Sequence, residues 1–202
     1  MDSLNDLIET FDNLLADLNG EWRLHKELFQ VPEHYILFAD SGPVIWHMLR
    51  DALIDSVFMS IARLLDPPAS CGKDNLSLSR ILLNMPPGDE REQTQRQYDE
   101  LVPLYNSALR HWRNRKLSHN DLMTIRGMSP LPQVSFNEIS ELIDKINKLG
   151  RRIGHVVQGV DKSFVPHISN DNWVWRLIET LKKGISQGRS VESSNAAHSG
   201  SD

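Results

Sequence analysis

The sequence predicts an all-α fold, a bundle of about five helices. Apolar residues recur at three- and four-residue spacing along most of the 202-residue chain, which places them on one face of each helix. No segment shows the strict apolar–polar alternation of a half-buried strand, and no repeat of fixed period is present. Apolar residues make up 40% of the chain, enough for a core at this length. We expect one domain over residues 1–186, since this length fits a single domain.

The first predicted helix extends from Leu4 to about Phe29, where Pro32 interrupts it. Its apolar stripe consists of Leu4, Leu7, Ile8, Phe11, Leu14, Leu15, Leu18 and Trp22. A second helix begins at Ser41-Gly42-Pro43, because proline is tolerated in a first turn, and Asp66-Pro67-Pro68 ends it.

A loop over 69–74 precedes a short helix that Ser77 caps and that continues to about Asn84. The third long helix starts near Asp89 after Pro86-Pro87-Gly88. Its apolar period continues across Pro103, which predicts a kink rather than an end.

Residues 127–133 are rich in glycine and proline and predict a loop. Ser135-Phe136-Asn137-Glu138 is a capping box that opens a fourth long helix. A final helix is expected from about Asp171 to Ile185. Residues 187–202 are mainly Ser, Gly, Asn and Ala, with little to bury, so we expect a disordered polar tail.

Charge is unevenly distributed along the chain, whose formal net charge is −5. Residues 1–21 contain six acidic residues and no Lys or Arg, whereas residues 110–116 contain four basic residues and no acid. These four are Arg110, Arg113, Arg115 and Lys116. The net charge argues against a protein that coats nucleic acid uniformly, but a local basic site is compatible with it. A contact with RNA or a nucleotide is therefore expected at residues 110–116.

Arg113 and His119 are the candidate reactive residues. Arginine holds a phosphate with a permanent charge, and histidine moves protons near neutral pH. On one uninterrupted helix, six residues of separation rotate the two side chains apart by about 240°. Convergence therefore requires a helix break or a second subunit. Ser118-His119-Asn120-Asp121 is similar to a capping box, with Asp in place of the usual Glu or Gln, and predicts such a break.

These residues resemble the signature of the HEPN superfamily (higher eukaryotes and prokaryotes nucleotide-binding), in which Arg and a polar residue precede His by four to six positions. Ala62 to Asp66, Asn75 to Leu78 and Arg113 to Asp121, in this order, resemble its abortive-infection AbiU2-like branch. The resemblance covers roughly residues 40–160.

The resemblance implies a helical bundle that forms a homodimer, with the two Arg-His motifs facing each other across the interface. It also implies a metal-independent endoribonuclease, in phage defence or as a toxin. His119 would be general base, or acid toward the leaving oxygen, and Arg113 would stabilise the charge on the phosphate. Asn114 would orient the phosphate or bond His119, and Asp121 would fix the imidazole tautomer. Arg110, Arg115 and Lys116 would attract the RNA backbone.

Other interpretations of the motif stay open from the residues alone. Arg113 can serve as a helix-end cation that satisfies the macrodipole, and His119 as a histidine of a capping turn. The chain can be a non-catalytic module that holds RNA, a nucleotide or a protein partner such as an antitoxin. It can also be a structural dimer that associates through Trp and Leu surfaces.

Several neighbouring residues also allow two interpretations. Asp51 and Asp55 either anchor Arg113 or Arg63 of the partner subunit, or form a solvated ion-pair face. Asp66 belongs to the resembled pattern, yet a salt bridge near the helix end explains it equally well. Trp112 is either a core anchor or a platform on which a base stacks.

The remaining patterns exclude several classes of protein. The histidines show no spacing typical of a metal site, and no phosphate loop or dinucleotide fingerprint is present, so no metal or cofactor is expected. Cys71 is the only cysteine, which excludes an intrachain disulfide. No apolar run approaches membrane-spanning length and no signal peptide opens the chain, so we expect a cytoplasmic protein.

Overall fold

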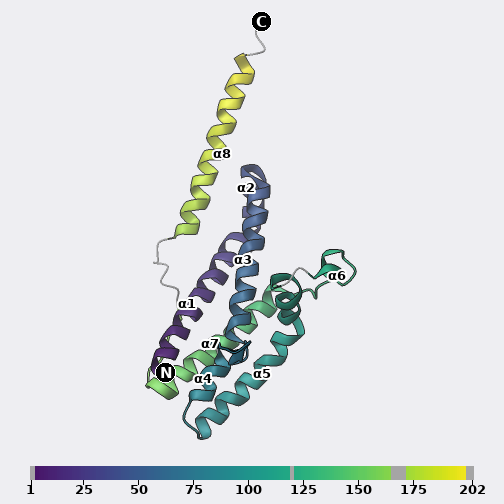
Figure 1. The fold of residues 1–202 in the computed structure, drawn as a ribbon. Helices are drawn as coiled ribbons and strands as arrows, with labels where there is room; N and C mark the ends of the chain where they lie inside the picture. The colour runs from purple at the N-terminus through teal and green to yellow at the C-terminus, as the bar shows by residue number, and fades with distance from the viewer. Residues whose placement is uncertain (1–2, 119–120, 165–171, 199–202) are drawn as a thin grey trace. The chain divides into compact units, whose positions relative to one another are not determined.

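The computed structural model describes residues 3–118, 121–164 and 172–198; the side chains of residue 108 and of residues after 187 are not described. Over these ranges the fold is all-α, as predicted, with eight α-helices, one π-helix and one two-stranded hairpin (Figure 1). The number of helices exceeds the predicted five, partly because the helix α2 (Pro32–Ser41) had no clear signal in the sequence.

Backbone contacts divide the chain into two compact units, which are described separately. The first unit comprises Met1–Glu21 and Asp55–His167, and the second comprises Trp22–Ile54 and Ile168–Asp202. A single domain over residues 1–186 stays a prediction.

The first helix, α1 (Leu4–Phe29), has the predicted bounds, but Pro32 does not lead into a loop. It occupies the first turn of α2 (Pro32–Ser41), where a missing N–H costs nothing. At this junction the Tyr35 hydroxyl donates to the carbonyl of Phe29 at 2.7 Å. Such a bond satisfies one of the carbonyls left unpaired where α1 ends. The prediction of a plain interruption was therefore incomplete.

The second predicted helix is α3 (Pro43–Leu64), and Ser77 caps α4 (Leu78–Asn84) as expected. Between them, the predicted loop contains a minimal antiparallel hairpin of β1 (Ala69–Ser70) and β2 (Lys73–Asp74). Its turn residues, Cys71 and Gly72, have φ values of 50° and 73°. Two consecutive residues with positive φ are typical of the tight turns that join short strands.

The remaining helices of the first unit follow the predicted order. They are α5 (Asp89–Trp112), which contains Pro103, the π-helix η1 (Arg113–Leu117), the short α6 (Leu122–Ile125) and α7 (Phe136–Gln158). The Ser135–Glu138 capping box is formed with both of its reciprocal bonds.

The core of the first unit lies between α1, α3, α4, α5 and α7. Its fully buried side chains include Ile8, Phe11, Leu15, Leu18, Val57, Ile61, Leu78, Ile81, Leu101, Leu109, Ile139 and Ile146. α1 and α7 approach closely at Gly150, where an added Cβ would lie 2.5 Å from Leu15 Cδ1. A glycine at this point permits the short distance between the two helices.

The second unit has its own small core. Leu28, Phe29, Leu37, Phe38 and Ile178 are buried together, and α2 packs against α8 (Trp173–His198). α8 starts after the predicted Asp171, which lies outside the described residues, and its backbone continues beyond residue 187. The expectation of a disordered tail thus differs from the structure over 188–198. The composition offers little to bury there, but it contains no proline to end the helix.

Candidate functional site

A single π-helical turn interrupts the helical path in the middle of the motif. We call η1 (Arg113–Leu117) the basic turn. The Ser118 N–H donates to the carbonyl of Arg113 at 2.8 Å, five residues earlier, and the Asp121 N–H donates to the carbonyl of Arg115 at 3.1 Å. The predicted break between Arg113 and residue 119 is therefore confirmed. Single π-turns of this kind are frequent at functional sites.

The cap that restarts the helix lies three residues after its predicted position. Ser118 ends the basic turn, and the Oδ1 atom of Asp121 accepts from both the N–H and the hydroxyl of Thr124, at 2.8 and 2.7 Å. These bonds lower the pKa of Asp121 and keep its carboxylate charged. The prediction of a capping box that starts at Ser118 was thus wrong by three residues, because Asp121 is itself a strong N-cap residue. His119 and Asn120 lie outside the described residues.

Arg113 forms an ion pair with Asp66, which follows the end of α3. The Arg113 Nη2 atom lies 3.0 Å from Oδ1 and 3.2 Å from Oδ2 of this carboxylate. The pair is partly shielded, with 35% of the Arg113 side chain and 19% of the Asp66 side chain exposed. The Ser79 hydroxyl donates to the carbonyl of Asp66 at 2.9 Å, which fixes the backbone behind the acid.

Asp66 is thus the anchor of Arg113, a role that the sequence offered to Asp51 and Asp55 as one of two interpretations, the other being a solvated ion-pair face. Asp51 instead lies 3.1 Å from Arg50 in the second unit. Asp55 binds Lys116, whose Nζ atom lies 2.9 and 3.1 Å from the two carboxylate oxygens. The sequence could not assign the partners of Arg113 and Lys116, because these two pairs join residues 47 and 61 positions apart in the chain.

Trp112, the residue before the basic turn, packs against residues of the turn and of neighbouring segments. Its indole N–H donates to the carbonyl of Pro132 at 2.9 Å, and its ring meets Phe58 edge-on, with centroids 5.4 Å apart. The Lys116 ammonium lies 5.0 Å from the centroid of the same ring, a distance typical of a cation–π contact. These contacts favour the packing role for Trp112 over that of a base-stacking platform.

The other predicted site residues lie around the turn. The Arg115 guanidinium donates to the carbonyl of Ser129 at 2.7 Å, which ties the following loop to the turn. The Asn114 side chain accepts from Arg113 at 3.2 Å, so its amide N–H groups stay available to a ligand. Arg110 is exposed on the last turns of α5 and donates to Asn106 at 3.3 Å.

The buried Tyr105 and the half-buried Tyr98 complete the surroundings of the Arg113–Asp66 pair. Burial raises the pKa of Tyr105, and the nearby charge of Arg113 opposes that shift. Burial also raises the pKa of Tyr98, against a smaller effect of a hydrogen bond with Ser79. Both phenols therefore stay protonated and uncharged beside the ion pair.

The site is less basic than its sequence suggests. Arg113, Arg115 and Lys116 each lie near one carboxylate, those of Asp66, Asp121 and Asp55 respectively, whereas Arg110 donates to the Asn106 amide. Charge that is already paired attracts a distant phosphate weakly, so a ligand must meet these cations at short range.

The part of the chain that the structure describes contains neither a cluster of metal-ligating side chains nor a helix that could span a membrane. Over residues 3–118, 121–164 and 172–198, no three His, Cys, Asp or Glu side chains gather in a group that could hold a metal ion. Within the same ranges, no helix is long and apolar enough to span a bilayer.

Comparison with known protein families gives a match over most of the chain. The model of the HEPN family AbiU2 matches residues 1–177. The match is longer than the predicted range of residues 40–160 and includes α1 and α2 as well as the basic turn. Comparisons with curated proteins and with solved structures gave no match.

Proposed function

The chain belongs to the AbiU2 family of HEPN proteins, and from this membership we propose that it is a metal-independent endoribonuclease. One observation carries the proposal: the backbone on both sides of His119 is bonded to the basic turn. The Ser118 N–H donates a hydrogen bond to the carbonyl of Arg113, and the Asp121 N–H donates one to the carbonyl of Arg115. These hydrogen bonds fix Ser118 and Asp121 relative to Arg113 and Arg115, which supports the proposed centre because catalytic groups need fixed positions.

The proposed reaction is transesterification within the RNA strand. The ribose 2′-oxygen attacks the adjacent phosphorus and loses its proton, while the bond from phosphorus to the 5′-oxygen breaks. His119 accepts the first proton as a base, or delivers a proton to the departing 5′-oxygen as an acid. The products are a 2′,3′-cyclic phosphate and a 5′-hydroxyl. DNA lacks the 2′-hydroxyl and is not a substrate.

Arg113 supplies the positive charge in this reaction. Negative charge develops on the phosphate oxygens as the 2′-oxygen attacks, and a pre-positioned guanidinium stabilises it. Asp66 holds Arg113 in place without burying it, since about a third of the arginine side chain is exposed. Asn114 would orient the phosphate, and Asp121 would orient the imidazole through the oxygen that does not cap α6.

The proposal includes a homodimer in which two such motifs share one interface. Arg110, Arg115 and Lys116 would guide the RNA backbone toward it. A role in phage defence or as a toxin fits an RNase whose activity a protein partner restrains.

Cleavage of single-stranded RNA in EDTA by the purified chain tests this function. We expect Arg113→Ala and His119→Ala each to lower the rate by about 100-fold or more. Arg151→Ala and His111→Ala, both at exposed helix positions, are the matched controls and should cleave at the wild-type rate. Arg113→Lys keeps the charge beside Asp66 and separates a loss of folding from a loss of the planar guanidinium. Equal rates of RNA cleavage for the wild type and all variants would contradict the assignment of Arg113 and His119 as catalytic residues.

One observation favours a second candidate, a non-catalytic RNA-binding module. Arg113 and Lys116 already bind the carboxylates of Asp66 and Asp55, and such pairs can serve structure alone. This candidate predicts salt-sensitive RNA binding with no cleavage product.

A further inference from the structure

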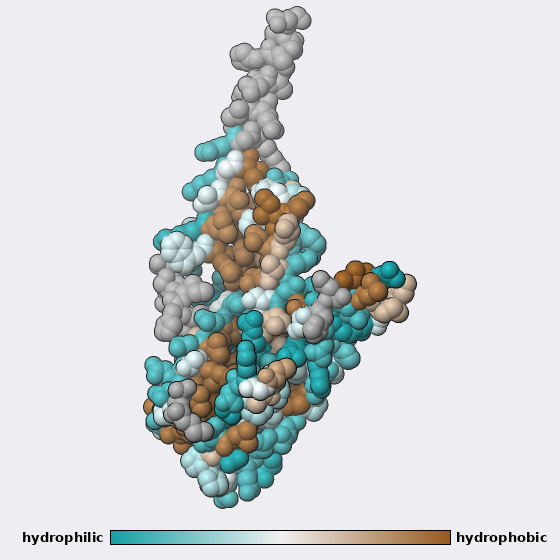
Figure 2. Space-filling view, in the orientation of Figure 1, coloured by the Kyte–Doolittle hydropathy of each residue, from teal (hydrophilic) through white to brown (hydrophobic). Residues whose placement is uncertain are grey.

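The short helix α6 and the turn after it present four large apolar side chains to solvent. We call residues 122–128 the α6 knob. The exposed fractions are 57% for Leu122, 49% for Met123, 65% for Ile125 and 62% for Met128. Figure 2 shows an apolar group at the right of the view, where α6 projects away from the other helices of its unit in Figure 1. Contiguous exposed apolar side chains mark an interaction surface more often than isolated ones do.

The knob has a defined backbone structure despite its exposure. Asp121 caps it at one end, and the N–H groups of Met128 and Ser129 both donate to the carbonyl of Met123, at 2.9 and 3.2 Å. The Arg115 guanidinium then ties the carbonyl of Ser129 to the basic turn. A surface held in one conformation loses little entropy when it binds.

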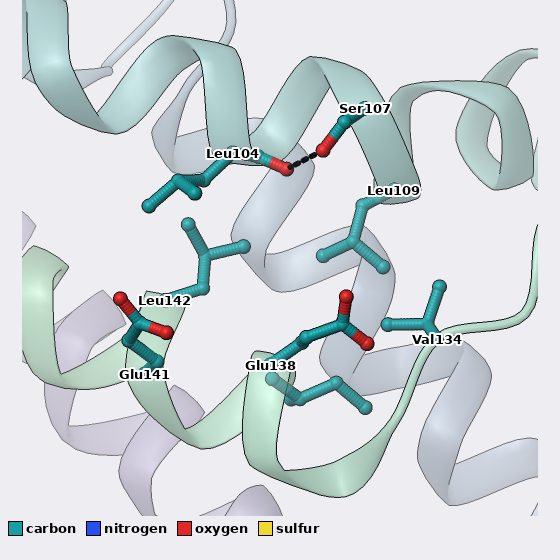
Figure 3. A pocket seen from close by; sticks show the side chains of 8 residues that line it. Leu104, Ser107, Leu109, Val134, Glu138, Glu141 and Leu142 are labelled. Carbon is teal, nitrogen blue, oxygen red and sulfur yellow. Dashed lines mark hydrogen bonds between the residues drawn. The ribbon is translucent and has the colours of Figure 1, made fainter.

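The same unit contains a groove between α5 and α7 that suits such a knob (Figure 3). Its apolar walls are Leu104, Leu109, Val134, Ile139 and Leu142, and it holds about 380 Å³ of space that is partly open to solvent. Glu141 lies at its edge, whereas the Glu138 carboxylate extends between Leu109 and Val134, as Figure 3 shows. The groove is therefore lined by apolar side chains together with two carboxylates.

The charges of the two surfaces are complementary. Arg126 is exposed on the knob, whereas Glu141, with 61% of its side chain exposed, lies at the rim of the groove. Because one chain has both surfaces, two copies can exchange them around a twofold axis, each knob entering the other groove. We propose that the α6 knob docks into the α5–α7 groove of a second copy of this chain.

The exchange would also bring the two motifs near each other. The groove residues Leu104 and Leu109 precede Arg113 on the same helical path by four to nine residues, which is on the order of 10 Å along a helix. A knob fixed to one basic turn would thus dock close to the other. The inference deepens the dimer of the proposed function, and its test does not depend on catalysis.

Sedimentation velocity of the full chain, over a range of concentrations, tests the interface. Ile125→Ser removes an exposed apolar side chain, so we expect it to raise the dimer dissociation constant by at least tenfold. Leu83→Ser is the matched control, because Leu83 is 56% exposed on α4, and it should leave the constant unchanged.

Charge reversal gives a sharper test. Arg126→Glu alone and Glu141→Lys alone each place like charges across both contacts and should weaken self-association. When the two variant proteins are mixed, both contacts regain opposite charges, so we expect them to form a mixed dimer as tightly as the wild type. Lys148→Glu, an exposed position on α7, should have no such effect.

Native mass spectrometry of the mixture distinguishes the outcomes. Restored mixed dimers support the reciprocal exchange. A monomeric wild type would overturn the proposal, as would variants that self-associate as tightly as the wild type does. The proposal would also fail if Ile125→Ser left the dimer intact and weakened only the binding of a different protein. A dimer that behaves as expected but leaves RNA intact would sustain this interface and remove the RNase proposal.

Discussion

The ion pair between Arg113 and Asp66 determines how the candidate site is built. A free arginine at a helix end samples many rotamers, whereas a carboxylate at 3.0 Å restricts the guanidinium to a narrow range. The partial exposure of Arg113 leaves donors for a phosphate. Asp66 is therefore a positioning residue for the proposed reaction, although it touches no substrate itself.

The substitution Asp66→Asn tests this role at the scale of one residue. Asn keeps the size and one acceptor but removes the charge, so Arg113 loses its fixed position. We expect RNA cleavage to fall by about tenfold to 100-fold, as small misplacements of catalytic groups do. We also expect the free energy of unfolding in urea to fall by about 1–2 kcal/mol, because the partly shielded guanidinium loses its partner.

Asp51→Asn is the control for this change. Asp51 pairs with Arg50 at a more exposed place in the second unit, so its loss should change stability by less than about 1 kcal/mol and leave cleavage intact. Wild-type cleavage by Asp66→Asn would show that Arg113 does not depend on this acid.

At the scale of elements, the contact of α1 with α7 depends on Gly150. An added Cβ would meet Leu15 at 2.5 Å and the Phe164 ring at 3.0 Å. Gly150→Ala should therefore lower the free energy of unfolding by about 1–3 kcal/mol, the usual cost of overpacking a core. Thermal and urea unfolding of the full chain measure this effect.

Gly184→Ala makes the same change where space is free. No atom lies within 4 Å of a Cβ added at Gly184 in α8, so alanine should stabilise the helix by up to about 1 kcal/mol. Opposite signs for the two substitutions are expected. Stabilisation by both would mean that α1 and α7 do not approach as closely as described.

Local signals were sufficient to predict most elements. Ser77 and Ser135 cap helices at the predicted residues, and α3 begins at the predicted Pro43. Each of these ends depends on chemistry within a few residues of the chain. α2 was missed because Pro32 fits both an interruption and a first turn. The two-residue strands are too short for a periodic pattern to be visible.

The partners within the site were beyond prediction for a different reason. The sequence identified the basic turn and the break within it, but Arg113 meets Asp66 and Lys116 meets Asp55 across 47 and 61 residues. Only the packing of α3 against α5 decides which acid meets which cation. Residue types and spacing alone left Asp51, Asp55 and Asp66 equally eligible.

At the scale of the whole molecule, the proposed function requires a chain of net charge −5 to attract an anionic ligand. Arg110 is bound to the Asn106 amide rather than to an acid, and Arg113 stays partly exposed beside Asp66, so we expect each copy to engage about two phosphates through these arginines. The logarithm of the RNA binding constant should then fall with the logarithm of salt concentration with a slope near −1.4 per copy, since single strands give about −0.7 per phosphate.

Fluorescence anisotropy of a labelled RNA, at salt concentrations from about 50 to 200 mM, measures this slope. His119→Ala is the background, so that cleavage does not interfere. Adding Arg110→Ala should reduce the slope by about 0.7, whereas Arg151→Ala on α7 should not. A steep slope that Arg110→Ala leaves unchanged would place the RNA on another surface.

The π-helical form of the basic turn has a consequence for the permitted length of the motif. A bond that spans five residues instead of four fits one more residue into the turn than an α-helix holds. If one of residues 113–117 were deleted, α-helical bonds could form in its place, and the wide turn would be lost. Ser118 and Asp121 would then leave the carbonyls of Arg113 and Arg115. The number of residues in this turn therefore determines which carbonyl groups the N–H groups of Ser118 and Asp121 can reach.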